Sequence, residues 1–327
     1  MRGIVRHPVI MLLLLLCLLG GGCSAKELMP ESAPREPGRH KMSLKVDGLE
    51  RSFIVHLPAG YDGKKSLPLV LMLHGGGGNA KATMWETGWA DKADSAGFIA
   101  VFPNAAARNP NRRSSFALNP QLWNDGSERF YPDQKAVDDV HFLELLLDAL
   151  AQSFAIDGKR VYLSGFSNGA SMSFLAAARL PHKIAAIAPV AGACWINPGI
   201  LKPPVPMLYM TGSDDPLNLI DGGAPRLASG NSDAVRAKPK PPVMVSILKW
   251  VTALGLPTTP LASSSRQGVA TMSYGEGAVE VRYVTVAGMG HTWAGGRSLL
   301  PESMVGATSD RINATDYIWA FFQQHSR

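Results

Sequence analysis

The sequence predicts an α/β fold in which a mostly parallel sheet is covered by helices on both faces. Short apolar runs typical of strands alternate with segments of helical periodicity along most of the chain. The run at residues 67–74 is almost continuously apolar, as expected for a strand that is buried on both faces. Alternation of this kind favours parallel strands joined by helical crossovers, and therefore this fold class.

The individual elements follow from local patterns. Residues 43–58 alternate apolar and polar side chains around a turn at Asp47-Gly48, which predicts an N-terminal antiparallel hairpin. Further strands are expected at 67–74, 98–102, 160–164, 184–191, 206–211 and 279–286, and helices at 80–96, 137–154, 170–180, 243–254 and 310–325. The loops 104–134 and 213–242 each follow a strand, so we expect them to shape a substrate site at the carboxyl edge of the sheet.

Composition excludes several classes of protein. The 327 residues are 46% apolar and 18% charged, a mixture that can bury a full core and is not that of a disordered chain. Three cysteines are too few for a disulfide scaffold or a four-cysteine zinc site. The net charge of +6 is spread without a basic block, so we expect no nucleic-acid partner. We find no ligand set for a metal or a nucleotide and expect no cofactor.

The N-terminus indicates export. Arg2 and Arg6 precede an apolar run at residues 9–19, which is shorter than the roughly 20 residues of a membrane span. We interpret residues 1–25 as a signal peptide. The small residues before Cys23 resemble a bacterial lipobox, so Cys23 is a candidate for lipidation and membrane anchoring. Cleavage after Ala25 is the alternative.

Two further segments complete the expected organisation. Residues 26–41 are polar and contain several Pro and Glu residues, which predicts a flexible tether. Residues 42–327 are expected to form one catalytic domain. The exported chain would then be extracellular or periplasmic.

The candidate nucleophile is Ser167. It stands in Gly165-Phe166-Ser167-Asn168-Gly169, a G-x-S-x-G motif between a predicted strand and a predicted helix. This strand–turn–helix context is the one that a nucleophile elbow requires, and glycine relieves the crowding of such a sharp turn. The alternative is a serine in an ordinary glycine-rich turn.

A serine nucleophile needs a general base that is oriented by an acid. His291 is the candidate base, because it is the one histidine after Ser167 that lies in a glycine-containing loop behind a predicted strand. The acid is expected between Ser167 and His291 in the chain. Asp214 and Asp215 directly follow the predicted strand at 206–211, and the residues alone leave the choice between them open.

The glycine run that begins at Gly75 is a candidate oxyanion hole. Gly75 and Gly76 follow the first buried strand and could present backbone N–H groups together with that of Asn168. A phosphate site is excluded, because no Lys-Ser/Thr pair follows the glycines. Trp123 and Trp293 are candidates for lining an acyl pocket, and a core role is equally compatible with either tryptophan.

Together these motifs resemble one family. In chain order they lie at 74–78, 123–126, 137–140, 165–169, 212–216 and 290–293. From about Ser43 to His325 the chain is similar to the secreted polyhydroxybutyrate depolymerase and feruloyl esterase group of α/β-hydrolases. The resemblance implies Ser167 as nucleophile, His291 as base and Asp215, which precedes a proline, as the acid.

The resemblance also implies a function. We expect a secreted serine carboxylesterase that forms an acyl-enzyme and hydrolyses hydroxyalkanoate or feruloyl and cinnamoyl esters. We find no module of the kind with which related enzymes bind solid polymer, so soluble or oligomeric esters are expected. One alternative is a peptidase or thioesterase with the same triad, because this fold hosts all of these activities. An alternative of another class is a catalytically inactive, lipid-anchored binding protein.

Overall fold

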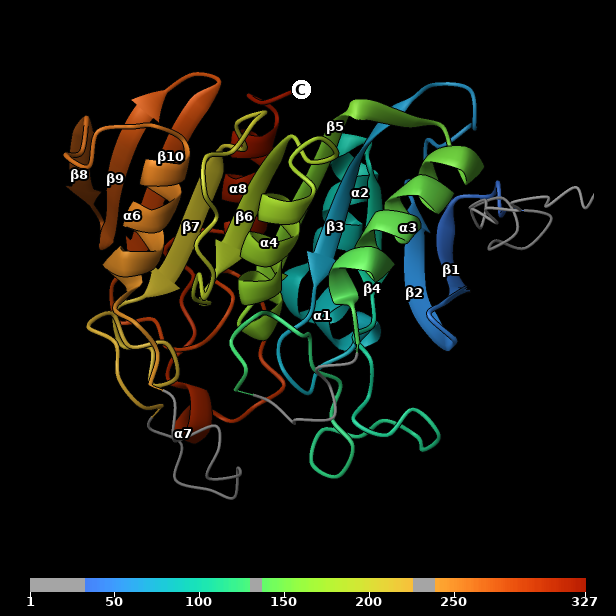
Figure 1. The fold of residues 1–327 in the computed structure, drawn as a ribbon, viewed down its shortest axis with the longest axis horizontal. Helices are drawn as coiled ribbons and strands as arrows, with labels where there is room; N and C mark the ends of the chain where they lie inside the picture. The colour runs from blue at the N-terminus through green and yellow to red at the C-terminus, as the bar shows by residue number, and fades with distance from the viewer. Residues whose placement is uncertain (1–32, 130–136, 226–238) are drawn as a thin grey trace, which may run out of the picture.

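The computed structural model describes residues 33–129, 137–225 and 239–327. Their main feature is one ten-stranded sheet in the order β1-β2-β4-β3-β5-β6-β7-β10-β9-β8 (Figure 1). The strands are β1 (Gly38–Val46), β2 (Leu49–Leu57), β3 (Leu67–Leu73), β4 (Ile99–Pro103), β5 (Ile156–Phe166), β6 (Ala186–Val190), β7 (Met207–Gly212), β8 (Ala262–Arg266), β9 (Val269–Glu276) and β10 (Val279–Val286).

The centre of the sheet is parallel and its edges are antiparallel. Neighbouring strands from β4 to β10 in the sheet order pair in parallel. The β1–β2 hairpin joins one side through an antiparallel β2–β4 contact, and β9 and β8 extend the other side. The predicted class, a mostly parallel sheet with an N-terminal antiparallel hairpin, is confirmed.

Helices cover both faces of this sheet. They are α1 (Ala80–Thr87), α2 (Trp89–Ala96), α3 (Asp139–Ser153), α4 (Asn168–Arg179), α6 (Val243–Ala253), α7 (Glu302–Val305) and α8 (Ala314–Phe322). Figure 1 shows α3, α4 and α6 in front of the sheet and α1, α2 and α8 behind it. Each face has its own apolar core. In the rear core, Phe98 stacks on Trp319 at 4.2 Å and Tyr162 on Phe322 at 4.6 Å between ring centroids.

The structure corrects two expectations about the elements and adds one pair of strands. The helix expected at 80–96 is divided into α1 and α2 at Gly88, whose φ of 69° lies outside the helical region. The hairpin begins at Gly38, so residues 38–41 pair with β2 and are not part of a tether. The pair β8–β9 was not predicted, because β8 is a serine-rich and fully exposed strand without apolar alternation.

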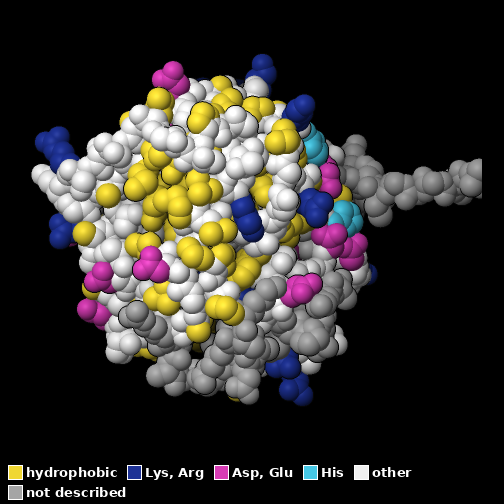
Figure 2. Space-filling model, turned by 60° about the vertical axis from the view of Figure 1, so that its left-hand side comes forward, with side chains coloured by type: hydrophobic (Ala, Val, Ile, Leu, Met, Phe, Trp, Pro, Cys, Tyr) yellow, Lys and Arg dark blue, Asp and Glu magenta, His cyan; other side chains and the backbone are white. Residues whose placement is uncertain are grey.

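The proposed signal peptide, with Cys23, and residues 26–32 of the expected tether lie outside the described residues. In the part of the chain that is described, no helix is both long and apolar enough to cross a membrane. Figure 2 shows apolar side chains grouped on one face, while Lys and Arg side chains lie apart from one another. Exposed apolar residues of the described chain include Ile200, Val245 on α6 and Leu261.

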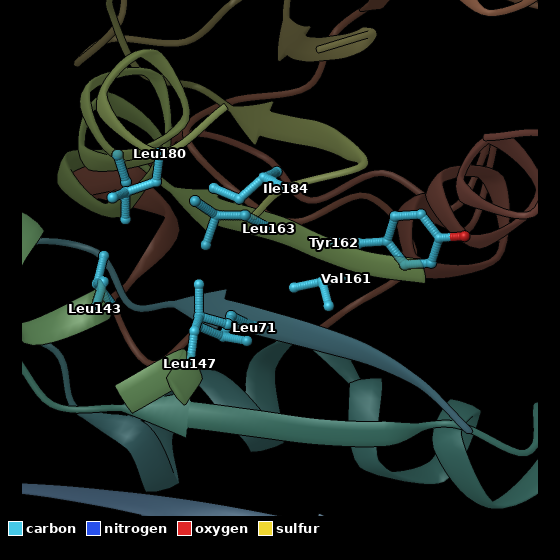
Figure 3. Close-up of a pocket in the computed structure, with 9 residues that line it drawn as sticks. Leu71, Leu143, Leu147, Val161, Tyr162, Leu163, Leu180 and Ile184 are labelled. Carbon is cyan, nitrogen blue, oxygen red and sulfur yellow. The ribbon is translucent and has the colours of Figure 1, made fainter. Parts of the chain in front are cut away.

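A small apolar cavity lies in the front core between α3, α4 and the central strands. Figure 3 shows Leu143 and Leu147 of α3 on one side and Leu163 of β5 on the other, with Leu71 between them. Tyr162 points the opposite way, and its hydroxyl donates a hydrogen bond to the carbonyl of His325 at 2.8 Å.

The substitution Leu163→Ala is expected to lower the free energy of unfolding by about 2–5 kcal/mol, because it enlarges a cavity that closely packed neighbours cannot close. Leu163 is only 2% exposed. Urea denaturation measures the change. The control is Leu118→Ala at a site that is 89% exposed, where a change within about 0.5 kcal/mol is expected. Equal losses in the two variants would contradict this prediction.

Candidate active site

Ser167 lies at a sharp turn between β5 and α4. Its backbone has φ 54° and ψ −114°, a conformation that is costly for a residue with a side chain. A Cβ atom added to Gly165 would lie 2.3 Å from the carbonyl oxygen of Gly169, and one added to Gly169 would lie 2.4 Å from that of Leu73. No side chain fits at either glycine. The residues of the G-x-S-x-G motif therefore build the turn that the sequence indicates.

The structure brings His291 and Asp215 together. His291 follows β10, Asp215 follows β7, and His291 Nδ1 lies 2.8 Å from Asp215 Oδ2. Both residues are buried. Asp214 is exposed, and its carboxylate accepts a hydrogen bond from the hydroxyl of Ser213 at 2.7 Å. Of the two neighbouring carboxylates, Asp215 is thus the one that faces the imidazole.

The surroundings of Asp215 keep its carboxylate ionised. Its second oxygen accepts hydrogen bonds from the N–H groups of Leu217 at 2.8 Å and Asn218 at 2.7 Å. Burial by itself raises the pKa of Asp215, but His291, Lys240 and the amide of Leu217 outweigh burial and hold the pKa below its ordinary value. An ionised Asp215 can orient the imidazole and stabilise its protonated form.

The imidazole of His291 lies beside the serine turn. Its ring packs against the ring of Phe166, which directly precedes Ser167, with 4.8 Å between centroids. Within the described residues, the Ser167 hydroxyl makes no hydrogen bond to His291. Such bonds are often long in a free enzyme and shorten when substrate binds. The Ser167 hydroxyl and the His291 imidazole therefore lie in one site, but they are not hydrogen-bonded to each other.

Glycines 75 and 76 lie against the serine turn. A Cβ atom added to Gly75 would be 3.4 Å from Ser167 Cβ, and one added to Gly76 would be 3.6 Å from Asn168 Cβ. Among the residues that the structure describes, the N–H groups of these two glycines have no acceptor. Asn168 is the first residue of α4, where backbone N–H groups have no partner within the helix. Unpaired amides therefore gather beside Ser167.

His74 fixes this glycine loop. Its Nδ1 donates to the carbonyl of Gly75 at 2.7 Å, and its Nε2 accepts from the N–H of Ala105 at 3.0 Å. Burial lowers the pKa of His74 to about 4, so the ring is neutral at physiological pH. With both nitrogens engaged, His74 serves as a support for the loop.

Asn168 is held by the loop at residues 123–125. Its Oδ1 accepts from the N–H of Trp123 at 2.8 Å, and its Nδ2 donates to Asp125 Oδ2 at 2.8 Å. The indole N–H of Trp123 donates to the carbonyl of His74 at 3.0 Å. Trp123 is therefore a clamp between the two loops beside Ser167. Its side chain is fully buried, and its role in lining an acyl pocket stays a prediction.

Trp293 and Glu86 border a small cavity next to His291. Phe166 and Arg297 also line this cavity. Trp293 is almost fully buried and donates its indole N–H to Thr315 Oγ1 at 3.0 Å. Its role as a pocket residue stays a prediction. Glu86 carries no sequence signal, because it lies in a helix among residues of ordinary composition.

The substitution Glu86→Gln is expected to stabilise the protein more at pH 8 than at pH 5. Burial raises the pKa of Glu86 from 4.5 to about 7, so the folded state prefers the protonated acid. Stability from this group is fully present below its unfolded pKa and is lost as the pH rises through about 7. A glutamine at this position cannot ionise, so the loss of folding stability with rising pH is removed. Urea denaturation at both pH values measures it, and exposed Glu302→Gln is the control. A pH-independent difference would contradict the prediction.

Comparisons with known proteins identify the family of this chain. A family model described as esterase PHB depolymerase matches residues 51–236. The chain belongs to the esterase PHB depolymerase family. Members of this family are esterases, so the chain is a hydrolase that acts on ester bonds. The resemblance expected from the motifs is confirmed.

Relatives in the esterase PHB depolymerase family cover different shares of the chain. The putative esterase NocK of Nocardia uniformis subsp. tsuyamanensis is 29% identical over 289 residues, 83% of this chain and 78% of NocK. Feruloyl esterase B of Piromyces equi is 28% identical over 254 residues, 76% of this chain and 44% of that enzyme. Poly(3-hydroxyalkanoate) depolymerase C of Paucimonas lemoignei is 29% identical over 137 residues, 42% of this chain and 30% of that enzyme. The chain thus spans less than half of the latter two enzymes.

Solved structures share the fold at low sequence identity. The acetyl xylan esterase from Aspergillus awamori superimposes with a TM-score of 0.55 at 13% identity, over 77% of this chain and 94% of that chain. A thermostable esterase superimposes with a TM-score of 0.51 at 15% identity, over 88% of this chain and 63% of that chain. These similarities confirm the α/β-hydrolase fold.

Proposed function

We propose that the chain is a serine carboxylesterase in which Ser167 is the nucleophile, His291 the general base and Asp215 the orienting acid. The observation that carries this assignment is the buried 2.8 Å contact between Asp215 and His291, with the His291 ring packed against the turn that presents Ser167. A strained serine beside unpaired amides is the arrangement expected at an acyl-transfer site.

The reaction would proceed in two halves. Ser167 Oγ attacks the ester carbonyl carbon while its proton passes to His291 Nε2, and the alcohol leaves with that proton. Water then attacks the acyl-enzyme, with His291 again accepting and returning a proton. The N–H groups of Gly75, Gly76 and Asn168 would stabilise the negative oxygen in both halves. Asp215 keeps the imidazole tautomer whose Nε2 can accept.

The proposed substrates are soluble or oligomeric esters with a hydroxyalkanoyl or a feruloyl and cinnamoyl acyl group. Relatives named feruloyl esterase and poly(3-hydroxyalkanoate) depolymerase support both classes. One feature of the site supports an apolar substrate group. The ring of Phe116 packs against Gly77 in the glycine loop and remains 54% exposed. It therefore offers an apolar surface close to the proposed oxyanion hole.

Two assays test this function together. A fluorophosphonate probe is expected to modify the peptide that contains Ser167, as found by mass spectrometry, and to stop hydrolysis of p-nitrophenyl butyrate. Rates of hydrolysis of methyl ferulate and of 3-hydroxybutyrate oligomers then show which acyl group the enzyme prefers. Cleavage of thioesters or peptides without cleavage of oxygen esters would favour the alternative activities. The absence of both labelling and hydrolysis would indicate an inactive binding protein.

We also propose that residues 1–25 direct export and that Cys23 is lipidated, on the sequence pattern alone. The chain would then act outside the cytoplasm as a membrane-anchored enzyme. Labelling of cells with a radioactive fatty acid is expected to mark the wild-type protein and not Cys23→Ser. A mature N-terminus at Lys26 without label would establish cleavage after Ala25 and overturn the lipidation proposal.

A further inference from the structure

Lys240 is a buried cation beside the proposed acid. Its side chain is only 7% exposed, and its Nζ lies 3.2 Å from Asn218 Oδ1. The backbone of Lys240 exchanges two hydrogen bonds with Gly223, each of 2.9 Å. Gly223 belongs to the segment that follows Asp215, so Lys240 is tied to the loop that carries the acid. A buried ammonium group lowers the stability of the folded state unless neighbouring groups balance its charge and accept its hydrogen bonds.

Asn218 links this lysine to both sides of the active site. Its backbone N–H donates to Asp215 at 2.7 Å, and its Nδ2 donates to the Tyr209 hydroxyl at 2.9 Å. That hydroxyl in turn donates to the carbonyl of Gly192 at 2.7 Å. Gly192 lies against the nucleophile turn, since a Cβ atom there would be 2.5 Å from the carbonyl oxygen of Ser167.

Lys240 sets the direction of this hydrogen-bond chain. An ammonium group donates and never accepts, so Asn218 must turn its oxygen toward Lys240 and its amide nitrogen toward Tyr209. The Tyr209 hydroxyl then receives a hydrogen bond and is free to donate to Gly192. Without the ammonium group, the Asn218 amide could turn over and Tyr209 would donate to it instead. The chain from the acid loop to the serine turn would then be broken.

The charges around Lys240 are balanced at longer range. Among the described residues, no carboxylate lies within the 4.0 Å of an ion pair, but Asp215 and Asp125 both favour the ammonium form and Arg129 opposes it. Burial, with a contribution from Arg129, lowers the pKa of Lys240 to about 7. The charged groups that act on it are therefore Asp215, Asp125 and Arg129, and Asp215 is in turn in contact with His291.

We propose that Lys240 is a positioning residue of the proposed catalytic pair: it fixes the Asn218 side chain and places a positive charge near Asp215, the partner of His291. This proposal rests on the function proposed above. The positive charge opposes a second positive charge on the His291 ring, which must be neutral to accept the Ser167 proton. It also supports the ionised form of Asp215.

The test compares Lys240→Met, Lys240→Gln and Lys240→Arg with the wild type. Loss of the cation is expected to move the low-pH limb of the kcat/KM profile upward by roughly one pH unit, the lower end of the effect of a nearby charge. Arginine is expected to restore the wild-type profile. Lys249→Met is the matched control, because Lys249 on α6 binds the carbonyl of Cys194 at 3.0 Å. It is expected to leave the profile unchanged.

A second readout does not need activity. The proton between His291 Nδ1 and Asp215 is expected to give a downfield ¹H NMR signal whose pH dependence moves in the same direction in Lys240→Met. Replacing a buried charge by an apolar side chain is often neutral for folding, and Lys240→Gln serves if methionine is not tolerated. An unchanged signal and an unchanged profile in a folded variant would overturn the proposal. An inactive wild type would count against the proposed function, while the NMR result would still decide the role of Lys240.

Discussion

The substitution Ser167→Ala is expected to lower kcat for ester hydrolysis by about 10⁶-fold, the loss found when a serine nucleophile is removed from a complete triad. The proposed acyl-enzyme forms through Ser167 Oγ, and alanine offers no atom that could replace it. The fold should persist, because the change removes one oxygen atom and leaves the glycines of the turn in place. Residual turnover would come from the amides and from binding alone.

The measurement is kcat with p-nitrophenyl butyrate, together with a thermal melt to show that the variant is folded. Ser263→Ala on the exposed strand β8 is the matched control and is expected to keep wild-type activity. A folded Ser167→Ala enzyme that retained more than about one per cent of wild-type kcat would place the nucleophile elsewhere, since such retention is far above the residual expected.

Local patterns were sufficient to predict most of the fold. The buried strand β3 and the glycines around Ser167 show in the sequence because one apolar run or one steric requirement determines each. The pair β8–β9 could not be predicted, because β8 gains its place by pairing with β9 and buries no side chain of its own. Gly88 looked compatible with a continuous helix, and only the packing of α1 and α2 shows where the helix is broken.

The residues of the candidate site were likewise predictable from the sequence only in part. Ser167, His291 and the glycine loop were found because motifs and chain order restrict them. Asp214 and Asp215 are chemically identical neighbours, and from the sequence only the family resemblance favours Asp215. The structure distinguishes them by burial and by the contact of Asp215 with His291. Lys240 and Asn218 are separated in the chain and form no motif, yet they share one buried network behind the acid. Networks of this kind depend on tertiary contacts, which no local sequence pattern contains.

The choice between the two aspartates gives the second large effect. Asp215→Asn is expected to lower kcat by about 10⁴-fold, whereas Asp214→Asn is expected to stay within about twofold of the wild type. In the variant, the side-chain oxygen would keep the N–H groups of Leu217 and Asn218, because both are donors. The amide nitrogen would then face His291 Nδ1 and donate to it.

That reversal explains why the loss should be so large for a change of one atom. A His291 ring that accepts at Nδ1 carries its proton on Nε2 and can no longer take the proton of Ser167. Both variants remove one formal charge at adjacent positions, so a general electrostatic effect would lower the two rates alike. A kcat that falls in Asp215→Asn and not in Asp214→Asn would therefore assign the effect to the imidazole tautomer. Equal losses, or a larger loss in Asp214→Asn, would show that the 2.8 Å contact between Asp215 and His291 does not orient the base.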